Sequence, residues 1–417
     1  MTRPIFVLGG AQTDFARNLA REGRDVADLV RETIETALTS LDLPAADIET
    51  VHVANAFGEL FNGQAHLGAM PATVIPGLVG VPASRHEAAC ASGGVALLAA
   101  MREIEAGRYE AALVVGVEQE RNVPGDAAAK TLGAAGWVNH EGDGFKYMWP
   151  HTFSRIGDEY ARRYGFDHRH VARLAEKAFA NAKKNPLAQT RGWEFGPGSF
   201  DEDDAKNPVV EGRVRRQDCS QLTDGGAALL VCSEPFARRY VERRGLAWSR
   251  VARVLGWGHT TNGLPLEPKL AASRESPYVL PQVRRAIEAA FRRAGLSTDH
   301  DEGVRGLDGI ETHDCFTITE YMAIDHFGIT RPGDSWKAIE DGAVEMGGRI
   351  PINPSGGLVG VGHPVGATGV RMVLDAARQV TGTAGANQVE GARTFGTLNL
   401  GGSAGTVVSF VVGQVNS

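Results

Sequence analysis

The chain has 417 residues and a mass of 44.4 kDa, which favours two or more packed units over one minimal domain. Its 43 Lys and Arg residues against 50 Asp and Glu give a net charge of −7, so no overall positive field would attract nucleic acid or an anionic membrane. No apolar run reaches the roughly 18 residues of a membrane span, and no secretion signal follows Met1. Four scattered cysteines without a Cys-x-x-Cys pair predict no disulfide framework and no bound metal. We therefore expect a soluble, cytoplasmic enzyme.

The N-terminal part of the chain alternates between strand and helix patterns. Buried strands are predicted where short apolar runs end in turn residues, and helices where apolar residues recur every three or four positions. The predicted elements, in order, are strand 5–8, helix 26–41, strand 51–56, helix 94–106 and strand 111–117. This alternation predicts a parallel sheet covered by helices on both faces.

The character of the sequence changes near residue 121. Residues 121–216 are richer in polar and aromatic side chains and contain two helical patterns, at 155–164 and 171–184. Because this stretch carries too many large apolar residues to stay unfolded, we interpret it as an inserted domain. A turn and a buried strand at 222–232 then resume the earlier pattern.

The last third of the chain repeats the first. Ala91-Ser92-Gly93 begins an apolar helix that a glycine-containing strand follows, and Ala367-Thr368-Gly369 begins another, over residues 370–380, that the strand 395–402 follows. Residues 406–413 form one more buried strand. Two matched helix starts with a strand after each predict an internal duplication.

Cys90, in the segment EAACASGG, is the first candidate for catalysis. A thiol at a helix start lies near unpaired N–H groups and the positive end of the helix dipole, so we expect its pKa to fall below the free value of about 8.5. Small neighbours leave room for a substrate. The alternative is a buried cysteine that only packs in the core.

Two further segments carry reactive side chains. His363 lies in the glycine-rich segment GLVGVGHPVGATG, where it could accept the thiol proton, unless it is a surface-loop histidine. His313 and Cys315 follow the strand-like run LDGIET, and strand ends supply catalytic groups in α/β folds. By itself, that pattern also fits a core cysteine beside a capping His-Asp pair. Cys219 and Cys232 are assigned to packing.

Two patterns are set aside. Residues 401–405 match Gly-x-Ser-x-Gly, but a nucleophile elbow leads from a strand into a helix, whereas a β-branched strand follows Ser403. The glycines at 360–366 have the wrong spacing for a dinucleotide-binding loop.

Taken together, these segments resemble the thiolase family over nearly the whole chain. EAACASGG resembles the nucleophile loop, NPSGGLVGVGHPVGATG the Gly-His-Pro loop, and TDGGAALLV the strand after the inserted domain. His313-Asp314-Cys315-Phe316 stands where common thiolases have Asn-Glu-Ala-Phe, and Asn399 stands where they have a second cysteine. This variant, like residues 175–189, resembles the sterol-carrier-protein-X type, although the chain ends at Ser417 without that type's carrier domain or a peroxisomal Ser-Lys-Leu end.

The resemblance implies an α/β fold of two duplicated five-stranded halves, in α-β-α-β-α layers, with an inserted loop domain. The N-terminal half would comprise residues 1–120 and 217–275, the loop domain residues 121–216, and the C-terminal half residues 276–417. It implies a homodimer or homotetramer without nucleic-acid partners.

The resemblance also implies an acyltransferase that interconverts acyl-CoA plus acetyl-CoA with 3-ketoacyl-CoA plus coenzyme A. Cys90 would hold the acyl group and His363 would accept its proton. Cys315 would exchange the α-proton if its pKa is modestly lowered, and His313 would donate to the enolate oxygen. The backbone N–H groups of Cys90 and Gly401 would hold the tetrahedral oxyanion. Coenzyme A thioesters are substrates, and no residue is assigned to binding them.

Other readings stay open at this point. A decarboxylating condensing enzyme would use one cysteine and two histidines, which Cys90, His313 and His363 satisfy, but it would not need Cys315. A retro-aldolase or another acyltransferase on the same scaffold, or a non-catalytic subunit completed by a partner protein, are the remaining alternatives.

Overall fold

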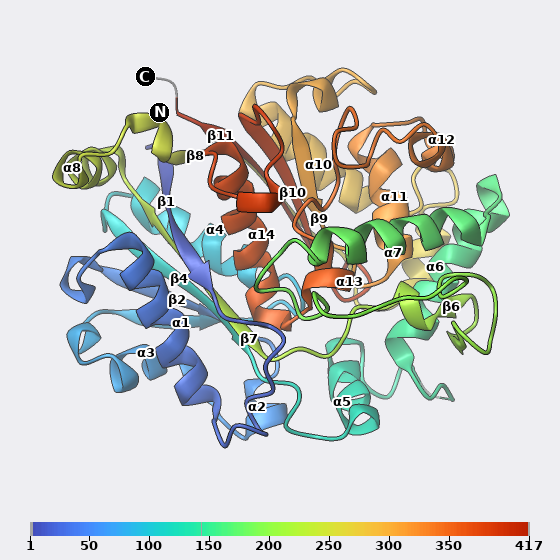
Figure 1. Ribbon diagram of the computed structural model, residues 1–417, viewed down its shortest axis with the longest axis horizontal. Coiled ribbons are helices and arrows are strands. Elements are labelled where there is room, and N and C mark those ends of the chain that lie inside the picture. Colours follow the sequence, from blue (N-terminus) through green and yellow to red (C-terminus); the bar gives the residue numbers. More distant parts are fainter. Residues whose placement is uncertain (1–2, 143, 416–417) are drawn as a thin grey trace.

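The computed structural model describes residues 3–142 and 144–415, and a single large sheet organises them (Figure 1). Within these residues the sheet has nine strands in the order β3-β2-β4-β7-β1-β8-β11-β10-β9, and β5 and β6 form a separate hairpin. The strands are β1 (Ile5–Gln12), β2 (Thr50–Ala54), β3 (Ala83–His86), β4 (Ala111–Glu118), β5 (Val209–Glu211), β6 (Val214–Arg215), β7 (Gly225–Cys232), β8 (Ala252–Thr261), β9 (Gly309–Thr312), β10 (Thr394–Gly401) and β11 (Thr406–Gln414).

The sheet is built from two halves with the same pairing scheme. In the first half β1 and β4 both pair antiparallel to β7, and β4 and β3 both pair parallel to β2. In the second half β8 and β10 both pair antiparallel to β11, and β10 pairs parallel to β9. A parallel bridge between Ile310 and Ile352 lies where a fifth strand would pair with β9. The repeat confirms the predicted duplication.

The sheet is mixed, so the predicted parallel sheet is wrong. β10 and β11 are joined by residues 402–405 alone, and strands joined by so short a turn can only run antiparallel. Their counterparts β4 and β7 have the same relative direction but are joined by residues 119–224. Buried strands of either direction consist of continuous apolar runs, so the sequence pattern did not reveal the direction.

The fourteen α-helices of the described chain flank these strands. Their bounds are α1 (Val26–Leu41), α2 (Gly58–Asn62), α3 (Met70–Val74), α4 (Ser92–Glu105), α5 (Gly125–Leu132), α6 (Met148–Tyr164), α7 (His168–Ala182), α8 (Glu234–Arg244), α9 (Leu266–Ala272), α10 (Pro281–Ala294), α11 (Thr317–Phe327), α12 (Ser335–Glu340), α13 (Gly357–Val361) and α14 (Val365–Val380). None of them combines the length and the apolar character that crossing a membrane requires.

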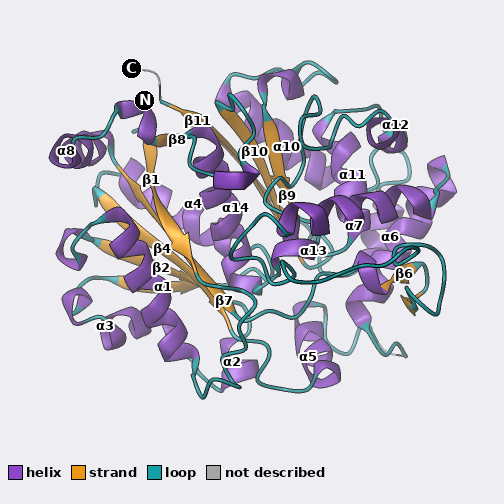
Figure 2. Ribbon diagram, viewed as in Figure 1, coloured by secondary structure: helices purple, strands orange, loops and turns teal. Residues whose placement is uncertain are grey.

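The two equivalent helices α4 and α14 lie together between the two groups of strands (Figure 2). They cross at glycines: a Cβ on Gly93 would lie 2.6 Å from the Val370 backbone nitrogen, and one on Gly369 would lie 2.5 Å from the Gly94 nitrogen. Because no side chain separates the backbones there, the N-terminal ends of both helices meet at one point. Cys90 lies just before α4 and His363 just before α14, so the crossing brings them together.

The inserted segment between β4 and β7 packs onto the second half of the molecule. It contains α5, α6, α7 and the β5–β6 hairpin, and α7 contacts α11 and α13. A fully buried ion pair joins Lys177 of α7 to Glu320 of α11, and the Lys177 ammonium also donates to the Ile352 carbonyl at 2.9 Å. α6 begins seven residues before the predicted start at residue 155, and its buried face contributes to the core of the second half.

Candidate active site

Cys90 occupies a tight turn that leads into α4. Ala89 has a left-handed φ of 51°, a conformation that residues with a Cβ adopt rarely and that clusters at functional sites. The Ser92 hydroxyl stabilises the turn, because it accepts from the Ala88 N–H at 2.9 Å and donates to the Ala89 carbonyl at 2.6 Å. The turn presents the Cys90 sulfur to a cavity of about 300 Å³.

The prediction of a lowered pKa for Cys90 is wrong. Burial, then the carboxyls of Glu120 and Glu118, raise the pKa of this thiol to about 12. The backbone N–H groups of Gly402 and of Cys90 itself point at the sulfur and oppose the shift. Helix-terminal donors are thus present as expected, but desolvation of the thiolate outweighs them. The resting residue is a neutral thiol that needs a base.

His363 is held with one ring nitrogen free. Its backbone N–H donates to the Thr223 hydroxyl at 2.9 Å, and its Nδ1 lies 2.7 Å from the Thr368 hydroxyl. The Thr368 hydroxyl donates its own proton to the Pro364 carbonyl at 3.2 Å. It must therefore accept from His363, so the hydrogen of the ring lies on Nδ1. His363 Nε2 is therefore an acceptor, and it is buried without a partner among the described residues. Burial, then the Arg371 charge, lowers the pKa of His363 to about 3, so the ring is neutral.

His313 and Cys315 follow β9 and lie beside Cys90 and His363. The Cys90 sulfur and a ring nitrogen each of His313 and His363 lie within 4.8 Å of one another, and the two rings meet edge to face with centroids 5.2 Å apart. Cys315 is buried and lines the cavity with Cys90. Burial, then the nearby Cys90, raises the pKa of Cys315 well above its ordinary value, so the condition of a modestly lowered pKa is not met.

Asn399 contacts both halves of the site, although the sequence assigned it no role. Its Nδ2 donates to the Cys90 carbonyl at 2.9 Å and lies 3.4 Å from His313 Nδ1. Because a carbonyl can only accept, this bond fixes which end of the amide faces the two groups. His313 Nδ1 must then accept, which leaves a hydrogen on Nε2. Burial lowers the pKa of His313 well below its ordinary value, so this neutral tautomer persists.

Acidic residues at the end of β4 also belong to the site, and sequence reasoning missed them. Glu118 accepts from the Gly366 N–H and Glu120 from the Val365 N–H, both at 3.0 Å, so they hold the first turn of α14 and with it His363. Acceptor oxygens at a helix N-terminus satisfy N–H groups that have no partner within the helix. The position of Glu118 and Glu120 at the end of a buried strand could have identified them from the sequence. Gly402, one residue beyond the predicted Gly401, was missed as a donor to Cys90.

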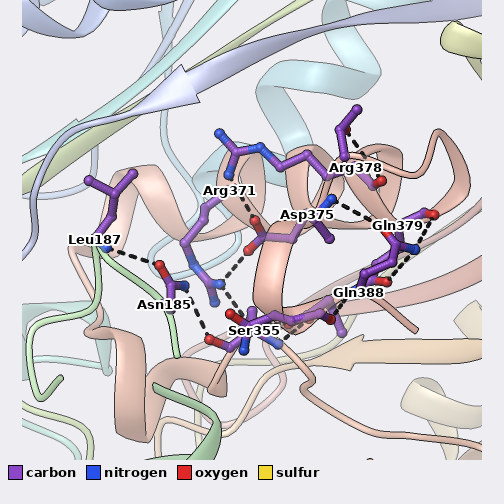
Figure 3. Close-up of polar contacts among 12 residues, drawn as sticks. Asn185, Leu187, Ser355, Arg371, Asp375, Arg378, Gln379 and Gln388 are labelled. Atoms are coloured by element: carbon purple, nitrogen blue, oxygen red, sulfur yellow. Dashed lines mark hydrogen bonds and ion pairs between the residues drawn. The ribbon is translucent and has the colours of Figure 1, made fainter. Parts of the chain in front are cut away.

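A buried polar network supports the other side of α14 (Figure 3). Arg371 is fully buried, and its Nη1 donates to Asp375 at 2.6 Å and to the Ser355 hydroxyl at 3.1 Å. Ser355 in turn donates to Glu311 of β9 at 2.7 Å. The network fixes the helix that follows His363 against the strand that precedes His313. The Arg371 charge also lowers the pKa of both histidines.

The thiol and two imidazoles of Cys90, His313 and His363 are also a donor set that Zn²⁺ accepts. The partner of the other ring nitrogen of each histidine distinguishes a metal centre from an acyl-transfer site. A zinc-bound histidine donates its other N–H to a partner, as His363 does to Thr368, but the other nitrogen of His313 accepts from Asn399 instead. The cavity is lined mainly by apolar side chains. These features fit an acyl-transfer site better than a metal centre.

Comparison with known proteins agrees with this geometry. Residues 5–235 match the thiolase N-terminal domain and residues 268–414 match the thiolase C-terminal domain-like family. The chain belongs to the thiolase family. It is 31% identical to the acetyl-CoA acetyltransferase of Methanothermobacter thermautotrophicus, over 97% of this chain and 98% of that protein. It is 29% identical to human sterol carrier protein 2, over 98% of this chain and 71% of that protein.

Solved structures show the same fold. The "Ltp2-ChsH2(DUF35) aldolase" has a TM-score of 0.77 and 20% identity, covering 100% of this chain and 99% of that one. Solved thiolases also superpose on nearly the whole chain. The predicted thiolase fold and the likeness to the sterol-carrier type are thereby confirmed.

Proposed function

We propose that the protein is a thiolase-type acyltransferase that interconverts acyl-CoA plus acetyl-CoA with 3-ketoacyl-CoA plus coenzyme A through an acyl group on Cys90. The observation that carries this proposal is the convergence of Cys90, His313 and His363 within 4.8 Å beside a cavity that Cys315 also lines. Relatives named acetyl-CoA acetyltransferase, at about 30% identity over nearly the full length, support it.

Cleavage begins with Cys90. His363 Nε2 accepts the thiol proton as the sulfur attacks the 3-keto carbon, because burial disfavours a thiolate formed in advance, and His363 holds the proton until Cys90 is released. The N–H groups of Cys90, of the predicted Gly401 and of Gly402 stabilise the oxyanion, and each such donor is worth about 3 kcal/mol. The carbon–carbon bond then breaks and leaves an acyl thioester on Cys90.

The enolate of acetyl-CoA is the other product of that step. His313 Nε2–H donates to the enolate oxygen, and Cys315 gives its proton to the carbon. The raised pKa of Cys315 suits this step, because the residue enters it as a thiol. Coenzyme A then returns a proton to Cys315 and attacks the acyl group, and His363 reprotonates Cys90. Condensation is the same sequence in reverse.

The test is incubation of the purified protein with acetoacetyl-CoA and coenzyme A, followed by chromatographic analysis of the thioesters. Thiolysis yields two acetyl-CoA for each acetoacetyl-CoA consumed. A decarboxylating condensing enzyme would instead leave acetoacetyl-CoA uncleaved and release carbon dioxide from malonyl-CoA in a separate incubation. No reaction in either incubation would indicate a subunit that needs a partner. A parallel incubation with a 3-hydroxyacyl-CoA tests retro-aldol cleavage, which would release an aldehyde.

Three further assignments belong to the same proposal. We propose a cytoplasmic homodimer or homotetramer, and light scattering of the purified protein tests its mass. The division into a half of residues 1–120 and 217–275, an inserted domain of residues 121–216 and a half of residues 276–417 stays a prediction. We also propose that no metal takes part, so a chelator should leave the acyl-transfer rate unchanged.

A further inference from the structure

Three buried carboxyl groups lie together beside the His363 loop, and two of them accept three or four hydrogen bonds. Glu118 accepts from four: the N–H groups of Ala56, Phe57 and Gly366 and the Asn55 amide, at 2.8 to 3.1 Å. Asp224 accepts from three backbone N–H groups, those of Leu19, Glu120 and Arg121, at 2.8 to 2.9 Å. Such donor sets favour the ionised form. They oppose the effect of burial on Glu118, which raises the pKa of that carboxyl to about 7.

Glu120 is the third carboxyl and has far fewer donors. It accepts from the Val365 N–H at 3.0 Å and, at the 3.5 Å limit of a hydrogen bond, from the Thr223 N–H. It is 1% exposed, and its charge would lie next to Glu118 and Asp224. Three adjacent buried carboxyls cannot all ionise, so the one with the poorest donor set holds a proton. Burial, then Glu118, raises the pKa of Glu120 well above its ordinary value, in agreement with this.

A protonated carboxyl has an O–H that must find an acceptor. Each oxygen of Glu118 already accepts two hydrogen bonds and Asp224 accepts three. Glu120 lines the cavity together with Cys90 and His363. Apolar side chains, which include Phe57, Leu132 and Val365, form most of the cavity wall. Polar groups placed in a mainly apolar pocket select ligands with matching polar atoms. The thiolase mechanism itself makes no use of Glu120.

We propose that Glu120 is a specificity-determining residue whose neutral carboxyl donates a hydrogen bond to an oxygen on the acyl chain. The preferred acyl group then carries a hydroxyl or carbonyl oxygen near its thioester end, because Glu120 lines the same cavity as Cys90, which would hold the thioester. This deepens the proposed function and rests on it for the identity of the substrate as an acyl-CoA.

Binding to a Cys90→Ala protein tests the inference without any chemistry. Calorimetry gives the Kd of butyryl-CoA and of 2-, 3- and 4-hydroxybutyryl-CoA, which place one hydroxyl at successive positions. We expect at least one hydroxyacyl ester to bind about tenfold more tightly than butyryl-CoA, the contribution of one hydrogen bond. Adding Glu120→Met should remove that preference. Adding Glu120→Gln should keep it, because an amide both accepts from Val365 and donates into the cavity.

The binding results distinguish a failure of the Glu120 inference from a failure of the proposed function. A protein with no hydroxyacyl preference, or a preference that survives Glu120→Met, overturns the inference. Loss of the preference in Glu120→Gln also overturns it, because that result requires an ionised carboxylate. Glu120→Gln is thus the matched control for Glu120→Met, because it changes the same side chain but keeps a donor in the cavity. If the preference is found but the protein with Cys90 intact transfers no acyl group, only the proposed function fails.

Discussion

Thr368→Val should slow acylation of Cys90 by switching the tautomer of His363. The substitution keeps the volume of a fully buried side chain but removes the hydroxyl that accepts from His363 Nδ1 at 2.7 Å. A buried N–H left without a partner costs about 1–3 kcal/mol. The hydrogen then moves to Nε2, where the ring can no longer accept the thiol proton. Since about 1.4 kcal/mol corresponds to a factor of ten, we expect acylation to slow about 10- to 150-fold.

The assay is rapid-quench intact mass spectrometry, which follows the acylated protein formed from an acyl-CoA in a single turnover. Thr368→Ser is the control, because it keeps the hydroxyl and should retain a rate close to that of the unsubstituted protein. A melting curve checks that both variants fold. If Thr368→Val acylates as fast as Thr368→Ser, the hydroxyl does not set the tautomer, and the assignment of Nε2 as the base is wrong.

Three other predictions concern the same site. Cys315→Ala should leave acylation intact but stop exchange of the acetyl-CoA α-protons into deuterated solvent, measured by NMR; continued exchange would remove Cys315 as the acid/base. Asn399→Ala should slow that exchange about tenfold, through loss of the contact that orients His313, and should slow acylation less, through loss of its bond to the Cys90 carbonyl; equal losses in both steps would contradict this role. The acylation rate should be flat from about pH 5 to pH 9, because the pKa of His363 is lowered to about 3 and that of Cys90 is raised to about 12. The base is lost only as pH falls toward 3, so a rate that rises with a midpoint between pH 6 and 8 would indicate a titrating thiolate–imidazolium pair instead.

Much of the fold could be predicted because periodicity reports burial directly. The helix predicted at residues 26–41 is α1 (Val26–Leu41), and the predicted strand at 111–117 is one residue shorter than β4 (Ala111–Glu118). Strand direction could not be predicted in this way. The apolar run of β7 would look the same in either direction, and its partner β4 is more than a hundred residues away along the chain.

In the site, too, features of a single short segment could be predicted, whereas contacts between distant segments could not. Cys90, His313 and His363 could be found because each lies in a short segment of unusual composition, and the helix crossing brings them together. The pKa of Cys90 was predicted in the wrong direction because helix-terminal N–H groups are local, whereas burial depends on the whole cavity. Asn399 was noticed only for lacking a thiol, since its contact with the Cys90 carbonyl joins residues 309 positions apart.

The central claim is that Cys90 carries the acyl group, and intact mass spectrometry tests it most directly. After mixing with excess hexanoyl-CoA, the protein should gain the mass of one hexanoyl group, and peptide mapping should place the group on Cys90. Cys90→Ala should show no gain, while Cys232→Ala, which removes a thiol buried in β7, should be acylated normally. An adduct that persists in Cys90→Ala, or none in the unsubstituted protein, would contradict the account.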